Sequence, residues 1–230
     1  MTGTMRIVPV IDLKGGVVVH ARRGRRAEYA PLSSPIVDGC EPVAVARALC
    51  ALCRTSVLYV ADLDAIAGNP VDAATLRALS AISEPWVDAG ATTHERAAVL
   101  HRAGVARNVV GTESLGPAAE LDSPVVLSVD LRDGRLISPD PELAGRNPAA
   151  AAPLAHELGV RELLVIDLAR VGSGNGPPLD ALAELAAALP ATAIYAGGGV
   201  RDDRDLRALE SAGAAGALVA TALHNGRIRP

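Results

Sequence analysis

Two aspartates stand at the ends of short apolar runs, where their carboxylates could perform acid–base chemistry. Asp12 ends the run in PVIDLKGG, and Asp130 ends the run in LSVDLRDG. Paired carboxylates whose environments separate their pKa values can serve as general base and general acid. We therefore predict that both are catalytic, with Asp12 as the base and Asp130 as the acid. The alternative is that these aspartates only cap a loop or bind an arginine.

Asp62 and Asp167 end two further apolar runs, LYVAD and LLVID, in the same way. We predict that both bind substrate, through its hydroxyl groups or through a basic heterocycle. The alternative is that some of these carboxylates are structural partners of nearby arginines such as Arg132.

Glycine-rich segments predict a phosphate site. The segment AGGGVR follows an apolar run and precedes a helical pattern. Backbone N–H groups at the start of a helix bind phosphate well, and glycines let the phosphate approach the chain closely. The residues predicted to hold phosphate are Gly198, Gly199, Ala220 and Thr221 in the second half of the chain and Gly90, Gly111 and Thr112 in the first half.

Asp88 distinguishes the two predicted phosphate sites, because it stands where the second half has Gly197. Like charges a few ångströms apart repel each other unless one is protonated or a cation intervenes. We therefore expect phosphate to bind the second-half turn first. The expected partner is a small metabolite that carries one phosphate.

The segment HARRGRRAEYAP, residues 20–31, carries four arginines, and Lys14 just before it is the only lysine of the chain. Arginine forks pair with phosphate or carboxylate oxygens, so the segment is a candidate lid over an anionic ligand. Arg22, Arg23 and Lys14 are accordingly predicted to bind substrate. The alternatives are a solvated surface loop or a subunit contact for the arginines, and a Schiff-base amine for Lys14.

These candidate residues follow apolar runs that are far apart in the sequence, so the fold must bring the ends of those runs close together. Runs rich in Val, Ile and Leu alternate with Ala- and Leu-rich segments of helical period, the pattern of βα units around a buried parallel sheet. Eight such units predict one (β/α)8 TIM barrel over residues 1–230, an α/β fold. The predicted strands are residues 6–12, 57–62, 85–88, 108–111, 125–130, 162–167, 192–196 and 216–220, and the predicted helices are 43–54, 73–81, 93–103, 148–158, 179–189 and 203–212.

The chain also repeats itself. WVDAGATTHERAAVLHRAG matches YAGGGVRDDRDLRALESAG, and RNVVGTESL matches GALVATALH. This predicts two half-barrels, about residues 1–120 and 121–230. Few residues follow the last strand, so we expect a truncated final helix. That side of the barrel would be uncovered or shielded by a second subunit of a homo-oligomer.

Composition restricts the class of protein. Only 2% of the 230 residues are aromatic and the formal net charge is -4, which disfavours nucleic-acid binding by stacking or by overall charge. No apolar run reaches the length of a membrane span, so we expect a cytoplasmic protein that does not contact a membrane. The three cysteines form no disulfide framework and the five histidines lack metal-ligand spacing. We predict no metal and no organic cofactor.

The paired PVIDLKGG and LSVDLRDG segments, the AGGGVR turn and the half-barrel repeat resemble the histidine-biosynthesis barrels. These are the ProFAR isomerase, HisA, and, less closely, the cyclase HisF. The resemblance covers nearly the whole chain. It implies aldose–ketose isomerisation of a two-phosphate substrate, with the aspartates that correspond to Asp12 and Asp130 in catalysis.

The sequence departs from the isomerase pattern at two positions. Ile166 stands where the isomerase usually has threonine, and Asp88 stands in the first-half turn. These departures and the arginine-rich segment are similar to a divergent HisA-related branch, found in organisms with tetrahydromethanopterin-linked one-carbon metabolism. Three hypotheses result: an isomerase of a phosphorylated ribosyl or sugar-like metabolite, a non-catalytic or regulatory phosphate-binding barrel, and a lyase or synthase that uses Lys14.

Overall fold

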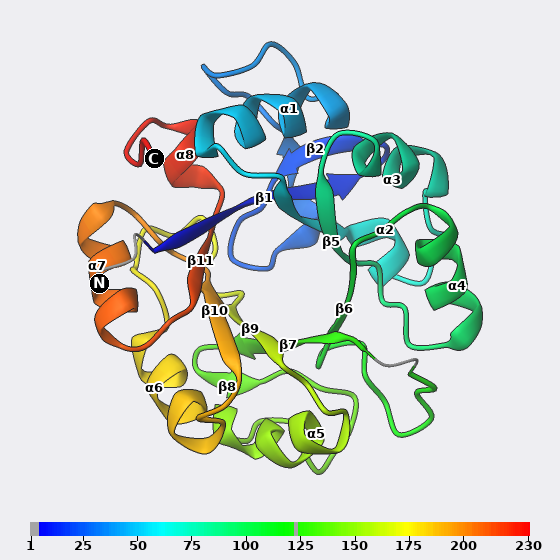
Figure 1. Ribbon diagram of the computed structural model, residues 1–230, viewed down its shortest axis with the longest axis vertical. Helices are drawn as coiled ribbons and strands as arrows, with labels where there is room; N and C mark the ends of the chain where they lie inside the picture. Colours follow the sequence, from blue (N-terminus) through cyan, green and yellow to red (C-terminus); the bar gives the residue numbers. More distant parts are fainter. Residues whose placement is uncertain (1–4, 122–123) are drawn as a thin grey trace.

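The computed structural model, which describes residues 5–121 and 124–230, is a closed barrel of parallel strands ringed by helices (Figure 1). The ring closes because the last strand pairs in parallel with the first. This confirms the (β/α)8 barrel. Its strands, in order around the ring, are β1 (Arg6–Lys14), β4 (Val57–Asp62), β5 (Glu84–Asp88), β6 (Arg107–Gly111), β7 (Val126–Arg132), β9 (Glu162–Asp167), β10 (Ala193–Gly197) and β11 (Gly216–Val219).

Helices cover the outer face of this barrel (Figure 1). They are α1 (Pro42–Cys53), α2 (Leu63–Ile66), α3 (Ala73–Ser80), α4 (His94–Arg102), α5 (Ala152–Glu157), α6 (Leu179–Ala188), α7 (Asp203–Ser211) and α8 (Thr221–His224). The final helix, α8, has four residues, as its predicted truncation requires. No helix in the described part of the chain is long and apolar enough to cross a membrane.

The helix predicted over residues 148–158 is divided in two. A 3₁₀ turn, η2, spans Pro148–Ala151, and α5 begins at Ala152. Pro153 has no amide hydrogen to donate to the carbonyl four residues earlier, so an α-helical first turn cannot form there.

Two strands of the ring continue into antiparallel extensions. After β1 the chain turns at Gly15 and Gly16, both with positive φ, into β2 (Val17–His20), which pairs with β1 and with β3 (Ala30–Pro31). After β7, β8 (Arg135–Leu136) pairs back in the same way. A short 3₁₀ helix, η1 (Arg26–Glu28), lies between β2 and β3. The two ends of the predicted lid segment are therefore held together by the pairing of β2 with β3, and β2 in turn pairs with β1.

Side chains alternate between the inside and the outside of the barrel along each strand. Tyr59, Trp86 and Tyr195 belong to the apolar cluster inside, whereas Val60 and Val165 belong to the cluster between strands and helices. Trp86 and Tyr195 pack edge to face with ring centroids 5.1 Å apart. These rings fill the barrel, and the carboxyl ends of the strands are left for a site.

Candidate active site

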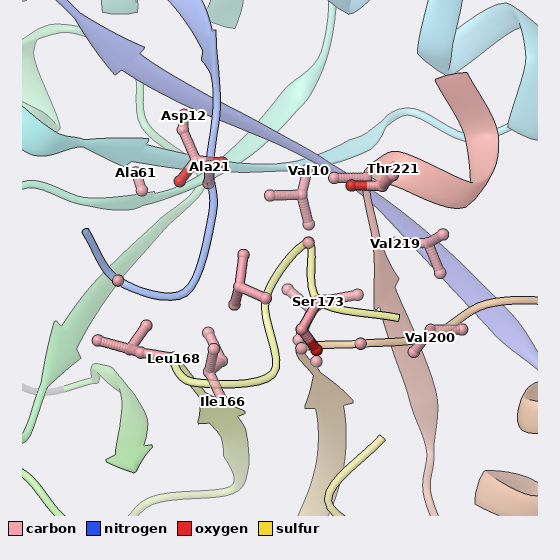
Figure 2. Close-up of a pocket in the computed structure, with 18 of the residues that line it drawn as sticks. Val10, Asp12, Ala21, Ala61, Ile166, Leu168, Ser173, Val200, Val219 and Thr221 are labelled. Carbon is pink, nitrogen blue, oxygen red and sulfur yellow. The ribbon is translucent and has the colours of Figure 1, made fainter. Parts of the chain in front are cut away.

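A cavity of about 300 Å³ opens at the carboxyl ends of the strands and draws residues from both halves of the chain. Figure 2 shows Asp12, Ser173 and Thr221 on different sides of this space. Apolar side chains, among them Val10 and Ile166, line the wall between them. A concave, largely apolar site with a few polar groups suits a small ligand.

Asp130 is buried near the carboxyl end of β7, and neighbouring residues donate hydrogen bonds to its carboxylate. Its Oδ1 accepts a hydrogen bond from Ser128 Oγ at 2.7 Å, and its Oδ2 accepts one from the Glu113 amide at 3.3 Å. Burial is the main cause that raises the pKa of Asp130 well above its ordinary value, and the charges of Glu113 and Asp88 add to the rise. Burial and the neighbouring carboxylates therefore favour the protonated form of the Asp130 carboxyl group.

Gly111 makes this position possible. A β-carbon on Gly111 would lie 2.3 Å from Asp130 Oδ2 and 3.1 Å from Asp88 Oδ2. Only glycine leaves room for the two carboxylates, which approach each other over the end of β6. Gly111 thus shapes the acidic side of the cavity.

Asp12 lines the same cavity from β1, which stands on the opposite side of the ring from β7. Burial raises the pKa of Asp12 to about 7, and the charge of Arg26 opposes this rise. No described residue donates a hydrogen bond to the Asp12 carboxylate. Near neutral pH this group is partly ionised and free to accept a proton.

Asp88 is 2% exposed and also lines the cavity. Burial raises its pKa to about 7, while a hydrogen bond from the Gly90 amide, 3.0 Å long, and the charge of Arg26 oppose this rise. Arg26, from η1, forms an ion pair with Glu113 on the far side of the mouth. The cation near Asp88 is therefore Arg26, which belongs to the lid segment and is distant from Asp88 in the sequence.

Asp62 and Asp167 lie outside the cavity. Both side chains point to the outer face of the barrel, and their carboxylates accept hydrogen bonds from backbone amides of the loops. Asp62 accepts a hydrogen bond from the Ala65 amide at 3.0 Å at the start of α2. Asp167 accepts from the amides of Gly134 at 3.1 Å and Ala169 at 3.0 Å. The structure thus places both residues in loop-anchoring roles, and it does not bring them to Asp12 and Asp130.

The second-half glycine turn opens directly into the cavity. Gly198 and Gly199 have φ values of +90° and +86°, and a β-carbon on Gly199 would lie 2.5 Å from the Gly176 carbonyl oxygen. Ala220 and Thr221 line the cavity beside them, where the first amides of α8 have no intrahelical acceptor. These four predicted residues are therefore gathered at one end of the cavity.

The first-half residues Gly90, Gly111 and Thr112 are not among the described residues that line the cavity. Thr112 is fully buried, and its Oγ1 accepts a hydrogen bond from the Asp130 amide at 3.0 Å. The two glycine turns of the repeat consequently differ in access as well as in charge.

The lid segment contributes residues other than those predicted. Arg22 and Arg23 are exposed and do not line the cavity, whereas Arg26 and Tyr29 do. Lys14 Nζ donates a hydrogen bond to the Arg26 carbonyl oxygen at 2.6 Å. Like Arg22 and Arg23, Lys14 is not among the residues that line the cavity. Lys14 therefore holds the lid segment in place.

Sequence reasoning missed Tyr59 and Glu113 as cavity residues. Each carried a signal: Tyr59 shares the inward-facing row of β4, and Glu113 follows the strand-end residues Gly111 and Thr112. Within residues 5–121 and 124–230, no group of three or more His, Cys, Asp or Glu side chains is arranged to hold a metal ion.

A parallel eight-stranded barrel with acidic groups and a glycine turn at the carboxyl ends of its strands is a frequent enzyme scaffold. Residues 6–229 match the family described as histidine biosynthesis protein, and the chain belongs to this family.

Several relatives align over almost the whole chain. The chain is 37% identical, over 96% of its length, to the 1-(5-phosphoribosyl)-5-((5-phosphoribosylamino)methylideneamino) imidazole-4-carboxamide isomerase of Rubrobacter xylanophilus, and covers 92% of that protein. The isomerase of the same name from Halobacterium salinarum is 30% identical over 96% of the chain and 92% of that protein. An uncharacterised protein of Methanocaldococcus jannaschii is 29% identical over 96% of the chain and 94% of that protein. Membership of the family supports an isomerase type of function.

Proposed function

We propose that this protein is an isomerase of a phosphorylated ribosyl or sugar-like metabolite that works by acid–base catalysis with two aspartates. One observation carries the proposal: Asp12 and Asp130, which the repeat relates to each other, stand on opposite strands and line the same cavity. An aldose–ketose isomerisation needs such a pair, because one proton leaves C2 and another is delivered to the ring oxygen.

The pKa values of the two groups support their assignment to different roles. Asp12, with a pKa of about 7, is the base that takes the C2 proton. Asp130, whose pKa is raised well above its ordinary value chiefly by burial, is the acid that protonates the ring oxygen when the ring opens. The hydrogen bonds from Ser128 and Glu113 fix its carboxyl group, so the proton is delivered from a defined position.

The phosphate of the substrate is proposed to bind at Gly198, Gly199, Ala220 and Thr221. At the other end of the cavity Asp88 and Glu113 present carboxyl groups, which disfavour a second phosphate there. We therefore expect a metabolite with one phosphate, and slow or absent turnover of ProFAR. As part of the same proposal, the metabolite belongs to tetrahydromethanopterin-linked one-carbon metabolism rather than to histidine biosynthesis. The acidic first-half end of the cavity argues against the two-phosphate substrate of histidine biosynthesis. The similarity of the arginine-rich segment to the divergent HisA-related branch is the reason for one-carbon metabolism.

The test combines binding with turnover. Native mass spectrometry of the protein with a panel of phosphorylated metabolites, ProFAR included, should find one retained compound that the protein isomerises. Asp12→Asn and Asp130→Asn should each lower turnover roughly 10²- to 10⁴-fold while the fold is kept. Asp133→Asn, an exposed aspartate just past β7, is the matched control and should keep full activity.

The outcomes separate the hypotheses. Near wild-type turnover in both catalytic variants would contradict the two-aspartate mechanism, and retention without turnover would favour a non-catalytic binding barrel. Borohydride trapping with carbonyl substrates tests the Lys14 alternative. We expect no trapping, because the Lys14 ammonium group is engaged by the Arg26 carbonyl.

A further inference from the structure

The two ends of the cavity differ in charge although the repeat relates them. Asp88, Thr92 and Glu113 of the first half stand where the second half has Gly197, Arg201 and Ala222. At each of these three positions the formal charge of the first-half residue is more negative by one. All of these residues except Thr92 line the cavity. One cavity therefore has an acidic end and an end suited to an anion.

The acidic end of the cavity has more carboxyl groups than cations. Asp88, Asp130 and Glu113 all line the cavity there. Arg26 is the cation that faces Asp88 and Glu113, and it forms an ion pair with Glu113. The other arginines of the described lining, Arg201 and Arg227, belong to the second half of the chain. A buried carboxylate without a partner is costly, which favours a ligand that brings a positive charge.

A second observation at this end is independent of the carboxylates. Tyr59 is 5% exposed and lines the cavity from β4. Its hydroxyl group has no hydrogen-bond partner among the described residues. This hydroxyl is not among the fully enclosed unpaired atoms of the described residues, so it opens to the cavity and is available to a ligand. The carboxyl groups that interact electrostatically with the Tyr59 hydroxyl are those of Asp88, Asp130, Asp12 and Glu113, so the hydroxyl lies among them.

We propose that Tyr59, Asp88 and Glu113 form a subsite for a protonated amine or amidine of the substrate. The proposal rests on the proposed function and extends it: the substrate carries a phosphate at one end and a cationic nitrogen at the other. The carboxylates accept hydrogen bonds from the nitrogen, and the Tyr59 oxygen accepts a further one. The subsite thus replaces the second phosphate site that the repeat would otherwise provide.

The test uses probes that differ only in charge at one end. These are ω-aminoalkyl phosphates of increasing chain length, the matched ω-hydroxyalkyl phosphates, and the corresponding amines and alcohols without phosphate. Their flexible chains allow each end to find its own subsite. Dissociation constants are measured by calorimetry at about pH 8, where Asp88, with a pKa of about 7, is ionised.

For the wild-type protein we expect the best amino phosphate to bind about tenfold or more tightly than its hydroxy partner. Glu113→Gln and Asp88→Asn should each reduce this ratio toward unity. Glu28→Gln removes the same charge from an exposed position of the lid segment outside the cavity and should leave the ratio unchanged.

Each failure has a distinct signature. Equal affinity within the amino and hydroxy pairs would overturn the cationic subsite, even where the phosphate strengthens binding as the proposed function requires. An amine preference without any gain from phosphate would support the subsite and contradict the phosphate site. Absence of binding by every probe at about 10 mM would overturn both.

Discussion

Replacing Asp88 with asparagine should stabilise the fold at alkaline pH. The Asp88 side chain is 2% exposed, and its pKa is raised from 3.8 to about 7, chiefly by burial. Between these two pH values the folded state holds a proton that the unfolded state has lost. Stability therefore falls as pH rises from about 4 to about 7, and the loss is complete above pH 7.

The size of the effect follows from the shift. A rise of roughly three pKa units corresponds to about 4 kcal/mol, which is the upper limit for the Asp88 contribution at pH 8. Asparagine has the same shape and no charge, and its oxygen can still accept the hydrogen bond from the Gly90 amide. Removal of the Asp88 charge also lowers the pKa of Asp130, which adds to the gain.

Urea unfolding at about pH 5 and about pH 8 measures this difference. Asp88→Asn should be more stable than wild type by a few kcal/mol at pH 8, and the gain should shrink at pH 5. Asp205→Asn is the control of opposite sign, because hydrogen bonds from Arg201 lower the pKa of Asp205. It should destabilise the fold at pH 8. A loss of stability in Asp88→Asn at pH 8, or a gain that does not depend on pH, would refute the reasoning.

Three further predictions concern the site. Gly111→Ala should lower turnover about 10²-fold, because its β-carbon would displace the Asp130 carboxyl group. In the loop after β6, the β-carbon of Gly116→Ala would meet nothing closer than 3.7 Å, so this control should stay active. In crystals soaked in phosphate, the anion should occupy the turn at Gly199 before the first-half turn, and Gly199→Ala should abolish this binding, since its β-carbon would lie 2.5 Å from a carbonyl oxygen. The kcat/KM of the true substrate should fall as pH decreases through about 7, because Asp12 must be ionised to act as the base, and a rate independent of pH there would exclude it.

Local patterns in the sequence were sufficient to predict the scaffold. Eight apolar runs with helical segments between them led to the barrel, because buried parallel strands read as continuous runs of branched residues. The predicted strands agree with the observed ones to within about two residues. The gathering of Asp12 and Asp130 also followed from sequence, since the carboxyl ends of all strands meet at one face of a barrel.

Only the tertiary structure decided which neighbours share the cavity. In the sequence, Asp62 and Asp167 end apolar runs just as Asp12 does. In the structure β1 continues past Asp12 to Lys14, whereas Asp62 and Asp167 end their strands. Their side chains face outward, because alternation along a strand reverses the side with each residue. Arg26 reaches Asp88 and Glu113 only because the segment after β1 folds back over the mouth. Charge and burial of a site depend on such long-range packing, so the acidic end of this cavity could not be derived from local sequence patterns.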